Sequence, residues 1–569
     1  MYLRSFCFAL FAVLLLAFGA GCKKSAPAEP ASNGPSQAAA QNTAIQTPPL
    51  DTIARLHWLG IKRLATETNA AYFMSIWNLP ETAKLEAQTL DKLAFWLASR
   101  AGRNASSSNQ PLVSDIPNFK TQISNLQYRQ SQIQPLLSDL LHEESYLEIR
   151  SATNGPAELA LAIHLDDARA KLWQSNFSAL QPLGISNLKS QISNPPALQP
   201  LAFSLQPLKN GWTLLGLSSG PNSTLAALVA KIQKDGSPFT PPETNFWLDA
   251  DLDFARLSRA FSLNWPLPDN CPKSTFTVIG DGQDVRTHGE FEFPKPLPLE
   301  LEPWNIPTNL IHNPLVGFTA VRSIRPWLKS FKPWTDLQLG VDPNQAYIWA
   351  QQGIPVFDFG AFPVANVSNF VDHASERLRE VANPWIAANR LGELQRATNF
   401  HGLVWNGAPF ISPQLHSVVD DAREFALAGL VGLVVTNREA PPELLDALVS
   451  RTNLLCYDWE ITQHRLDHAL YITQLARFLA HKAQLSKDSQ SLLWLKAVGP
   501  KLGNCITLLS EVDPTHLSFV RRSSFGCNSF EFSLLSDWFE SPQFPIGLHT
   551  FTAPAPPARS LTNALSAPH

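Results

Sequence analysis

The segment Gly216-Leu217-Ser218-Ser219-Gly220 has the residue types that best fit covalent catalysis in this chain. It matches the G-x-S-x-G pattern, in which the glycines allow a turn tight enough to expose the serine Oγ. Asp249, or Asp251, and then His288 follow in the order acid, His that such enzymes use. A serine hydrolase is therefore one function to test. The sequence favours an ordinary strand-to-helix turn instead, because no His-Gly-Gly segment precedes it and the strands read as hairpins.

Asp249, Asp251 and Asp253 form a D-x-D-x-D motif that could supply oxygen ligands to a cation. A calcium loop needs Gly at its sixth position and Glu at its twelfth, where this chain has Phe254 and Ala260. The metal site is therefore the weaker alternative. The favoured interpretation is a strand whose last aspartate, Asp253, caps a helix beginning at Phe254.

His464 and His468 lie four residues apart in a segment with helical periodicity. Zinc peptidases use H-E-x-x-H, in which a glutamate after the first histidine is the base, and Arg465 occupies that place here. We therefore expect a solvated helix face. The chain also lacks a phosphate-binding glycine loop and a dinucleotide fingerprint, so no cofactor is expected.

Four cysteines remain once Cys7 and Cys22 are set aside with the N-terminal segment: Cys271, Cys456, Cys505 and Cys527. They allow three disulfide pairings, and buried free thiols are the alternative. The 33 Phe, 16 Trp and 7 Tyr could line a carbohydrate-binding cleft. Most of these aromatic residues lie inside apolar segments, so packing in the core is favoured.

Residues 1–22 have the order of a secretory signal. Arg4 precedes an apolar run over residues 6–18, which is shorter than the roughly 20 residues that span a bilayer. Gly19-Ala20-Gly21-Cys22 then resembles the lipobox of bacterial lipoproteins, with Gly19 where that family usually has Leu. The resemblance is to uncharacterised bacterial lipoproteins. It implies lipidation of Cys22 and attachment to a membrane facing the periplasm, and Lys23 suggests the outer membrane.

The charge of the chain argues against nucleic acid as a partner. The formal net charge is −4 and no basic run occurs in the folded region. The expected partners are the membrane, through the N-terminal lipid, and an envelope polysaccharide or protein. The oligomeric state stays open.

Periodicity predicts an α+β fold made of two tandem similar lobes, each a mixed, mostly antiparallel sheet with packed helices. The expected organisation is a signal peptide over 1–22, a disordered tether over 23–50, a first lobe over 51–293, a Pro-rich linker over 294–313, a second lobe over 314–540 and a Pro/Ala-rich tail over 541–569. Among the local elements we expect a helix over 51–64, a strand over 71–77 and a final strand over 529–534. The Ile-Ser-Asn patches at 122–126 and 185–194 read as inserted surface loops.

Internal similarity supports the two lobes. Residues 212–217 align with residues 425–430, which places Val431 opposite Ser218. Asn270-Cys271 and Asn504-Cys505 each precede an expected hairpin. The alternative is one large irregular α+β domain. Taken with the lack of a convincing catalytic set, these features favour a non-catalytic structural or binding role in the cell envelope.

Overall fold

The computed structural model describes most of the chain after residue 50. The described residues are 51–103, 116–151, 157–180, 202–208, 210–218, 223–239, 246–261, 267–353, 357–433, 438–479, 486–542 and 544–545. The signal segment with Cys22, the tether, the second Ile-Ser-Asn patch and the tail after residue 545 lie outside them, so those predictions stay predictions. No helix in the described part of the chain is long and apolar enough to cross a membrane.

The residues group into two compact units according to which of them lie close together in space. Unit 1 consists of residues 1–70, 90–280 and 289–295, and unit 2 of residues 71–89, 281–288 and 296–569. The division after residue 295 falls within the expected Pro-rich linker, but residues 71–89 and 281–288 belong to unit 2. Helix α4 (Pro80–Arg103) and strand β8 (Val285–Glu292) contain residues of both units.

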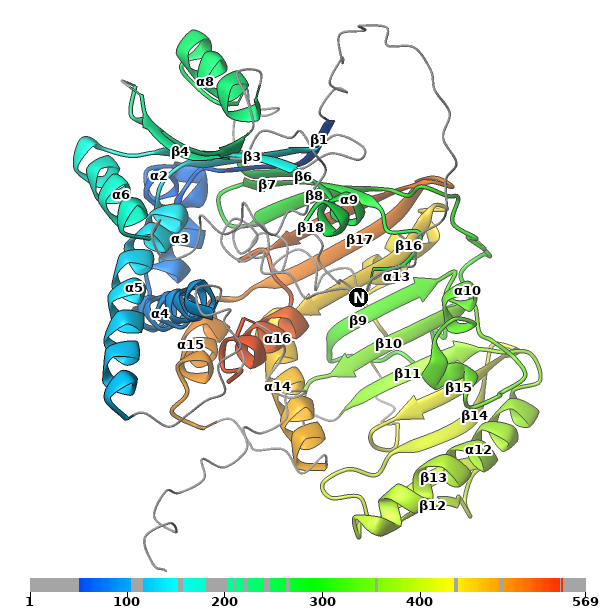
Figure 1. Cartoon of the computed structure of the whole chain (residues 1–569). Helices are drawn as coiled ribbons and strands as arrows, with labels where there is room; N and C mark the ends of the chain where they lie inside the picture. Colours follow the sequence, from blue (N-terminus) through cyan, green and yellow to red (C-terminus); the bar gives the residue numbers. More distant parts are fainter. Residues whose placement is uncertain are drawn as a thin grey trace, which may run out of the picture. The chain divides into compact units, whose positions relative to one another are not determined.

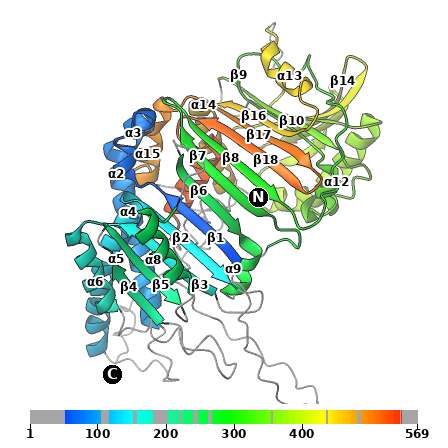
Figure 2. The same cartoon turned by 90° about the horizontal axis from the view of Figure 1, so that it is seen from above.

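Unit 1 is built on an antiparallel sheet. Its elements are β1 (Asp51–Trp58), α2 (Ile61–Leu64), η1 (Thr68–Ala70), α5 (Ile116–His142), β2 (Ser145–Ser151), β3 (Ala157–His164), α6 (Asp167–Leu180), β4 (Ala202–Pro207), β5 (Trp212–Ser218), α8 (Thr224–Asp235), β6 (Phe246–Asp253), α9 (Phe254–Ala260) and β7 (Lys273–Gly280). The strands pair in the order β4-β5-β3-β2-β1-β6-β7 (Figure 2).

Helices lie on both faces of the unit 1 sheet. Figure 1 shows α8 on one side of strands β3 and β4, and α5 and α6 on the other. Helix α8 begins where the Ser223 hydroxyl accepts a hydrogen bond from the Ala226 amide, and it ends at Gly236 in the left-handed conformation. Strands β2 and β3 are buried along almost their whole length, and β3 is accordingly apolar from Leu159 to Ile163, whereas β2 carries Glu148 and Arg150 between its apolar residues.

Unit 2 contains a larger antiparallel sheet. Its elements are α3 (Ala71–Trp77), β9 (Leu315–Arg322), α10 (Arg325–Leu328), α11 (Lys332–Thr335), β10 (Gln345–Gln351), β11 (Asp358–Pro363), α12 (Val367–Ala388), β12 (Glu393–Arg396), β13 (Gly402–Asn406), β14 (Gln414–Asp420), β15 (Arg423–Gly429), α13 (Pro442–Val449), β16 (Leu454–Ile461), α14 (Thr462–Leu479), α15 (Gln490–Val498), η4 (Gly499–Lys501), β17 (Asn504–Asp513), β18 (His516–Ser523) and α16 (Ser529–Phe539). The strand order is β12-β13-β14-β15-β11-β10-β9-β16-β17-β18.

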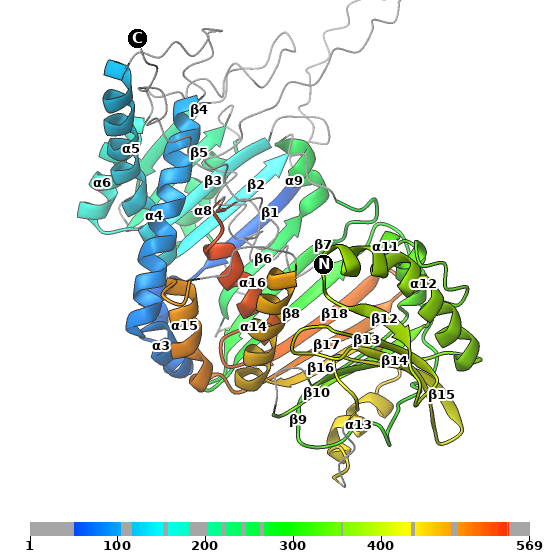
Figure 3. The ribbon, with the colours of Figure 1, turned by 90° about the horizontal axis from the view of Figure 1, so that it is seen from below.

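One face of the unit 2 sheet carries a large apolar core. Phe318, Trp349 and Tyr457 lie on it, and Leu444 and Leu448 of α13 pack against them. The other face is covered by α12 near β14 and β15, and by α14 near β9 and β16. Figure 3 shows α14 and α16 side by side.

Four local predictions are wrong, and the reasons are physical. Residues 51–58 form a central strand, buried on both faces, so periodicity could not distinguish it from a helix. Residues 71–77 form helix α3 and not a strand, for the same reason. Residues 122–126 lie within helix α5 and are not a loop. Residues 529–539 form helix α16, because Asn528 and Glu531 make a capping box that the strand prediction overlooked.

The two sheets share irregularities as well as strand order. A one-residue bulge lies at Ile53 of β1 opposite β2, and another at Val316 of β9 opposite β10. A second bulge lies at Trp247 of β6 opposite β7, and at Leu455 of β16 opposite β17. We call residues that occupy the same place in these two pairing patterns ladder-equivalent.

One of the sequence alignments fails against the pairing. Lys273 begins β7 opposite Asp253, and Asn504 begins β17 opposite Ile461. The ladder-equivalent of Asn504 is therefore Lys273. Cys271 precedes β7, whereas Cys505 lies inside β17, so the two Asn-Cys pairs do not correspond.

Candidate functional site

Charged side chains gather on one face of the unit 1 sheet. Alternate residues of a strand project from the same face, and the pairing of β2, β1, β6 and β7 brings these residues into adjacent rows. We call the six residues the charged face: Arg55 of β1, Glu148 and Arg150 of β2, Asp249 and Asp251 of β6, and Lys273 of β7. The sequence predicted only two of them, because they come from four segments that are distant along the chain.

The charges on this face are paired with one another. Arg55 Nη2 lies 3.3 Å from Asp249 Oδ2, and Arg150 Nε lies 2.7 Å from Glu148 Oε1. Lys273 Nζ lies 3.5 Å from Asp251 Oδ1. The pairs are partly exposed, with Arg55 retaining 36% of its side-chain surface. The basic side chains of this face are therefore reachable by solvent, while the carboxylates of Glu148 and Asp249 are buried.

Asp249 is the most buried aspartate of the charged face. Burial raises the pKa of its carboxyl above the usual range, and this outweighs the opposing effects of Arg55 and of the Thr277 hydroxyl. That hydroxyl donates a hydrogen bond of 3.2 Å to Asp249 Oδ1. The carboxylate is therefore held by two donors in a setting that favours its protonation.

His57 lies beside Arg55 on the same face of β1 and is only 3% exposed. Its Nε2 lies 2.8 Å from Glu144 Oε1, and Arg63 Nη1 lies 2.8 Å from the other carboxylate oxygen. Burial alone would raise the pKa of Glu144, but the hydrogen bond and charge of His57 and the charge of Arg63 hold it below its usual value. Because the ionised carboxylate only accepts, Nε2 of His57 donates.

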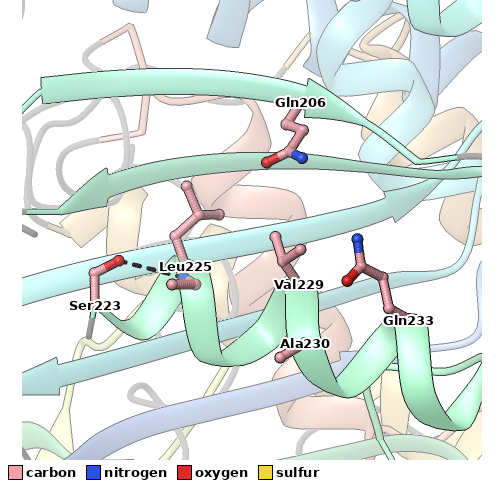
Figure 4. A pocket seen from close by; sticks show the side chains of 7 residues that line it. Gln206, Ser223, Leu225, Val229, Ala230 and Gln233 are labelled. Atoms are coloured by element: carbon pink, nitrogen blue, oxygen red, sulfur yellow. Dashed lines mark hydrogen bonds between the residues drawn. The ribbon is translucent and has the colours of Figure 1, made fainter. Parts of the chain in front are cut away.

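A shallow cavity lies at the edge of the same face, between β4 and α8 (Figure 4). It has a volume of about 430 Å³ and is lined by Gln206, Ser223, Leu225, Ala226, Val229, Ala230 and Gln233. Two amide groups, from Gln206 and Gln233, supply most of its polar character. The Ser223 hydroxyl accepts a hydrogen bond of 3.2 Å from the Ala226 amide and so caps α8.

The candidate catalytic serine and aspartate are not brought together. Ser218 ends β5 and Asp249 lies on β6, and strands β3, β2 and β1 separate those two strands. At about 4.8 Å per strand the separation is roughly 19 Å, too far for a hydrogen-bonded relay. His288 is exposed on β8, in the part of that strand that belongs to unit 2.

The three aspartates of the D-x-D-x-D motif each have a protein partner. Asp249 is bound by Arg55 and Thr277, and Asp251 by Lys273. Asp253 accepts a hydrogen bond of 2.8 Å from the Arg256 amide and so caps α9, as the sequence predicts. Among the described residues no group of three or more His, Cys, Asp or Glu side chains is arranged to hold a metal ion.

The expectation of a solvated face at His464 and His468 is wrong for the second histidine. His468 is 3% exposed, and its Nδ1 lies 3.2 Å from Asp358 Oδ2 on β11. Arg465 binds the other oxygen of Asp358. Burial would raise the pKa of Asp358, but the His468 hydrogen bond and the Arg465 charge outweigh it and lower that pKa. We call these three residues the Asp358 clamp.

The clamp depends on a small residue in β9. A Cβ on Gly317 would lie 2.7 Å from Cδ of Arg465, so the arginine side chain passes directly over the Gly317 backbone. An acidic residue between Phe357 and Phe359, in an otherwise apolar strand, was the sequence signal that could have identified this buried ion pair.

Two further acidic groups in unit 2 are buried and bound by protein groups. The Glu460 carboxylate accepts hydrogen bonds from the backbone amide and hydroxyl of Ser529 at the start of α16, at 2.7 and 2.5 Å. Arg521 binds both oxygens of Glu531, at 2.9 and 2.7 Å. These groups are buried parts of the fold and do not form a ligand site.

The four cysteines after Cys22 are free thiols. Burial raises the pKa of Cys456 to about 12, and burial also raises that of Cys505. Both thiols are therefore protonated at neutral pH and unsuited to nucleophilic attack.

No family model, no curated protein and no solved structure matches this chain.

Proposed function

We propose that this chain is a non-catalytic binding protein of the bacterial cell envelope, attached to the membrane through lipid on Cys22, with the charged face of unit 1 as its binding surface. The N-terminal resemblance to bacterial lipoproteins supports the location. The composition and arrangement of the charged face support the binding role.

The observation that carries the proposal is a difference between ladder-equivalent positions. Arg55 corresponds to Phe318, Glu148 to Trp349, and Asp249 to Tyr457. The unit 2 residues are buried in the apolar core. In unit 1 Arg55 keeps 36% of its side-chain surface, while Glu148 and Asp249 are buried charges held in ion pairs with arginines. Charges placed where the same sheet elsewhere carries a core suggest selection for interaction with something outside the unit.

We further infer that the units are copies of one α+β lobe. In support, seven strands follow the same order in each unit, with β4-β5-β3-β2-β1-β6-β7 corresponding to β14-β15-β11-β10-β9-β16-β17. Counting along the ladders from the bulges makes Gly216 ladder-equivalent to Gly429. The alignment of residues 212–217 with 425–430, made on sequence alone, requires the same correspondence.

The anchor is tested by fractionation of cells. Replacing Cys22 with Ala should move the protein from the membrane pellet to the soluble fraction, because one residue carries the attachment. A Cys7→Ala variant is the matched control and should remain in the pellet. A Cys22→Ala protein that still sediments would refute the lipid anchor.

The binding role is tested with purified cell-wall sacculi. The intact protein should co-sediment with them, and the double variant Arg55→Met, Asp251→Asn should lose this association. A serine-reactive fluorophosphonate probe tests the hydrolase alternative. Labelling that disappears in Ser218→Ala would overturn the non-catalytic proposal.

A further inference from the structure

We infer that unit 2 carries a second membrane contact, in which Trp327 and Phe331 enter the surface of a phospholipid bilayer. The two residues lie on the connection between β9 and β10, which contains the short helices α10 (Figure 1) and α11 (Figure 3). The contact goes beyond the proposed function, because it uses neither Cys22 nor the charged face of unit 1. It shares with that proposal only the location of the chain at a membrane.

Trp327 and Phe331 form an exposed aromatic pair. Trp327 is 52% exposed and Phe331 is 40% exposed. Their ring centroids lie 4.7 Å apart with an angle of 16° between the ring planes, so the rings stack on each other. Large aromatic side chains gain much from burial, and an exposed apolar patch of this kind indicates a surface that a partner covers.

The fold holds the inner side of the same segment. Leu328 is only 6% exposed, and the indole Nε1 of Trp334 donates a hydrogen bond of 2.8 Å to Asp342 Oδ1. Arg325 forms an ion pair with Glu300. The segment is therefore fixed to the rest of unit 2, and the exposed pair is already ordered before it meets a partner, which lowers the entropic cost of binding.

The backbone around the pair is hydrogen-bonded within the segment. The Ser330 amide donates a hydrogen bond of 3.0 Å to the carbonyl of Trp327. The carbonyl of Phe331 accepts from the amides of Trp334 and Thr335, at 2.9 and 3.1 Å. Backbone groups that are bonded in this way do not depend on water, so the segment can enter a poorly hydrated environment at little cost.

Two exposed lysines accompany the aromatic pair. Lys329 lies between Trp327 and Phe331 in the sequence, and Lys332 follows Phe331 directly. Lys332 is 82% exposed and lies 2.7 Å from Asp336, an ion pair that is open to water. A lysine stem can lie along apolar surface while its ammonium group reaches a phosphate. Aromatic rings with neighbouring lysines are typical of surfaces that rest in the membrane interface.

The same end of the unit 2 sheet has exposed apolar side chains on two other connections. Val419 precedes the turn between β14 and β15, and Val512 precedes the turn between β17 and β18; they are 68% and 64% exposed. The antiparallel pairing places both turns at the end of the sheet where β9 passes into β10. Three such connections at one end favour a broad partner, as a bilayer is.

The stacking of the two rings argues against a sugar as the occupant. Sugars pack their C–H groups on open ring faces, and the stack already uses one face of Trp327 and one of Phe331. Acyl chains need no open face, because the hydrophobic effect is non-directional and depends on the area removed from water.

Quenching of tryptophan fluorescence by brominated lipids tests the contact. The full chain is bound to vesicles of phosphatidylethanolamine and phosphatidylglycerol, with or without bromine on the acyl chains. We expect brominated vesicles to quench part of the native emission, and Trp327→Phe to lose about half or more of that quenching, because this indole meets the acyl chains.

Trp385→Phe is the matched control. Trp385 is 45% exposed and lies 18 residues after the start of α12, about 27 Å along that helix from the end of β11. Its replacement should leave the quenching unchanged. Native quenching in Trp327→Phe, or an equal loss in Trp385→Phe, would overturn the inference.

A charge reversal tests the role of the lysines. Lys329→Glu should reduce the quenching with an unchanged melting temperature, because an anion then faces the lipid phosphates. Lys171→Glu, on the exposed surface of α6, should keep the native quenching. Equal quenching in the two variants would contradict the contact. Dimers that disappear in Phe331→Ser, without any quenching by lipid, would assign the pair to a second copy of the chain instead.

This contact and the proposed function can fail separately. If Cys22→Ala is released from membranes but Trp327 is not quenched in the native chain, the anchor survives and the second contact does not. If Trp327 is quenched but Cys22→Ala still sediments, the second contact survives and the lipid anchor does not.

Discussion

The sheets of units 1 and 2 share strand order and bulge positions, yet charged and apolar residues exchange faces between them. At ladder-equivalent positions on one face, unit 1 has Arg55 and Asp251 where unit 2 has Phe318 and Trp459. On the other face the relation reverses, with Leu252 in unit 1 and Glu460 in unit 2. Strand pairing is made by backbone groups and does not depend on which side becomes the core.

The helices that pack on each sheet determine which of its faces is shielded from water. In unit 2, α13 packs its leucines against the apolar face, and the opposite face carries the Asp358 clamp beneath α14. In unit 1, α8 contacts β2, β3 and β5, and is not seen to pack on β6 or β7. The charged face is thus only partly covered: Arg55, Arg150 and Lys273 keep about a third or more of their side-chain surface, whereas Glu148 and Asp249 are buried. A charge is stable only where solvent or a partner compensates it, so the covering helix and the sequence of each face must agree.

The largest test transfers a charge from one sheet to the other. Phe318→Arg places the ladder-equivalent of Arg55 in the unit 2 core, where Phe318 is 1% exposed. We expect a loss of about 4 kcal/mol or more in the free energy of unfolding, because the cation is buried without a partner. Urea unfolding followed by tryptophan fluorescence measures it.

The reverse transfer is the control for that test. Asp251→Trp installs the ladder-equivalent of Trp459 on the charged face, and releases Lys273, which is 43% exposed. We expect a change below about 1 kcal/mol, as for other surface positions. Equal losses in the two variants would show that the faces do not differ as described.

The second test removes the centre of the Asp358 clamp. Asp358→Ala leaves Arg465 and His468 without their carboxylate, and we expect a loss of about 3 kcal/mol in the free energy of unfolding. Asp467→Ala, on the exposed side of the same helix α14, should change stability little. A tolerated Asp358→Ala would mean that the clamp is not a stabilising feature of unit 2.

The third test concerns the space that the clamp requires. Gly317→Ala should cost about 1–2 kcal/mol, because its Cβ would meet Arg465, although Ala54 fills the ladder-equivalent position in unit 1. Gly360→Ala on β11 is the matched control, since no atom lies closer than 3.8 Å to the added Cβ. Thermal melts of the two variants should therefore diverge, and identical melts would contradict the path assigned to Arg465.

The smallest expected effect is that the stability contributions of Asp358 and Asp249 change in opposite directions as the pH falls. The pKa of Asp358 lies below its ordinary value of 3.8, so its stabilising contribution is present above that value and is lost as the pH falls through the lowered pKa. The pKa of Asp249 lies above the same value, so the folded state binds its proton first and gains stability as the pH falls.

Substitution by asparagine isolates each contribution. As the pH falls from 7 to 3, the stability advantage of the native chain over Asp358→Asn should shrink, while that over Asp249→Asn should grow. Urea unfolding at a series of pH values gives both curves. Slopes of the same sign would show that the two carboxyls are not in opposite environments.

Several local elements were predictable because the signal was local. The strand ending at Asp253, the cap of α9 and the helical segment around His464 and His468 follow from side-chain patterns within a few residues. The alignment of residues 212–217 with 425–430 also needed only the sequence. By contrast β1 and α3 are short apolar segments whose type depends on what packs against both sides, and their prediction failed.

The site was less predictable than the elements. Asp249 and Asp251 attracted attention through their spacing, but the interpretations considered were a catalytic acid and a metal ligand. Their actual partners are Arg55 and Lys273, which lie on the two strands that flank β6 in the sheet. Arg55 is 194 residues away from Asp249 along the chain. Spacing along the chain carries no information about such cross-strand neighbours.

The sequence by itself determined the α+β class, the strand that ends at Asp253 and the cap that begins α9, because backbone preference and capping act over a few residues. Only the tertiary structure decided which face of each sheet became a core, that Ser218 and Asp249 lie apart, and that Asp358 meets Arg465 and His468. Those outcomes depend on antiparallel pairing between distant segments and on which helix covers the paired strands. The strand pairing and the choice of covering helix both depend on how all the elements pack together, and no single element specifies them.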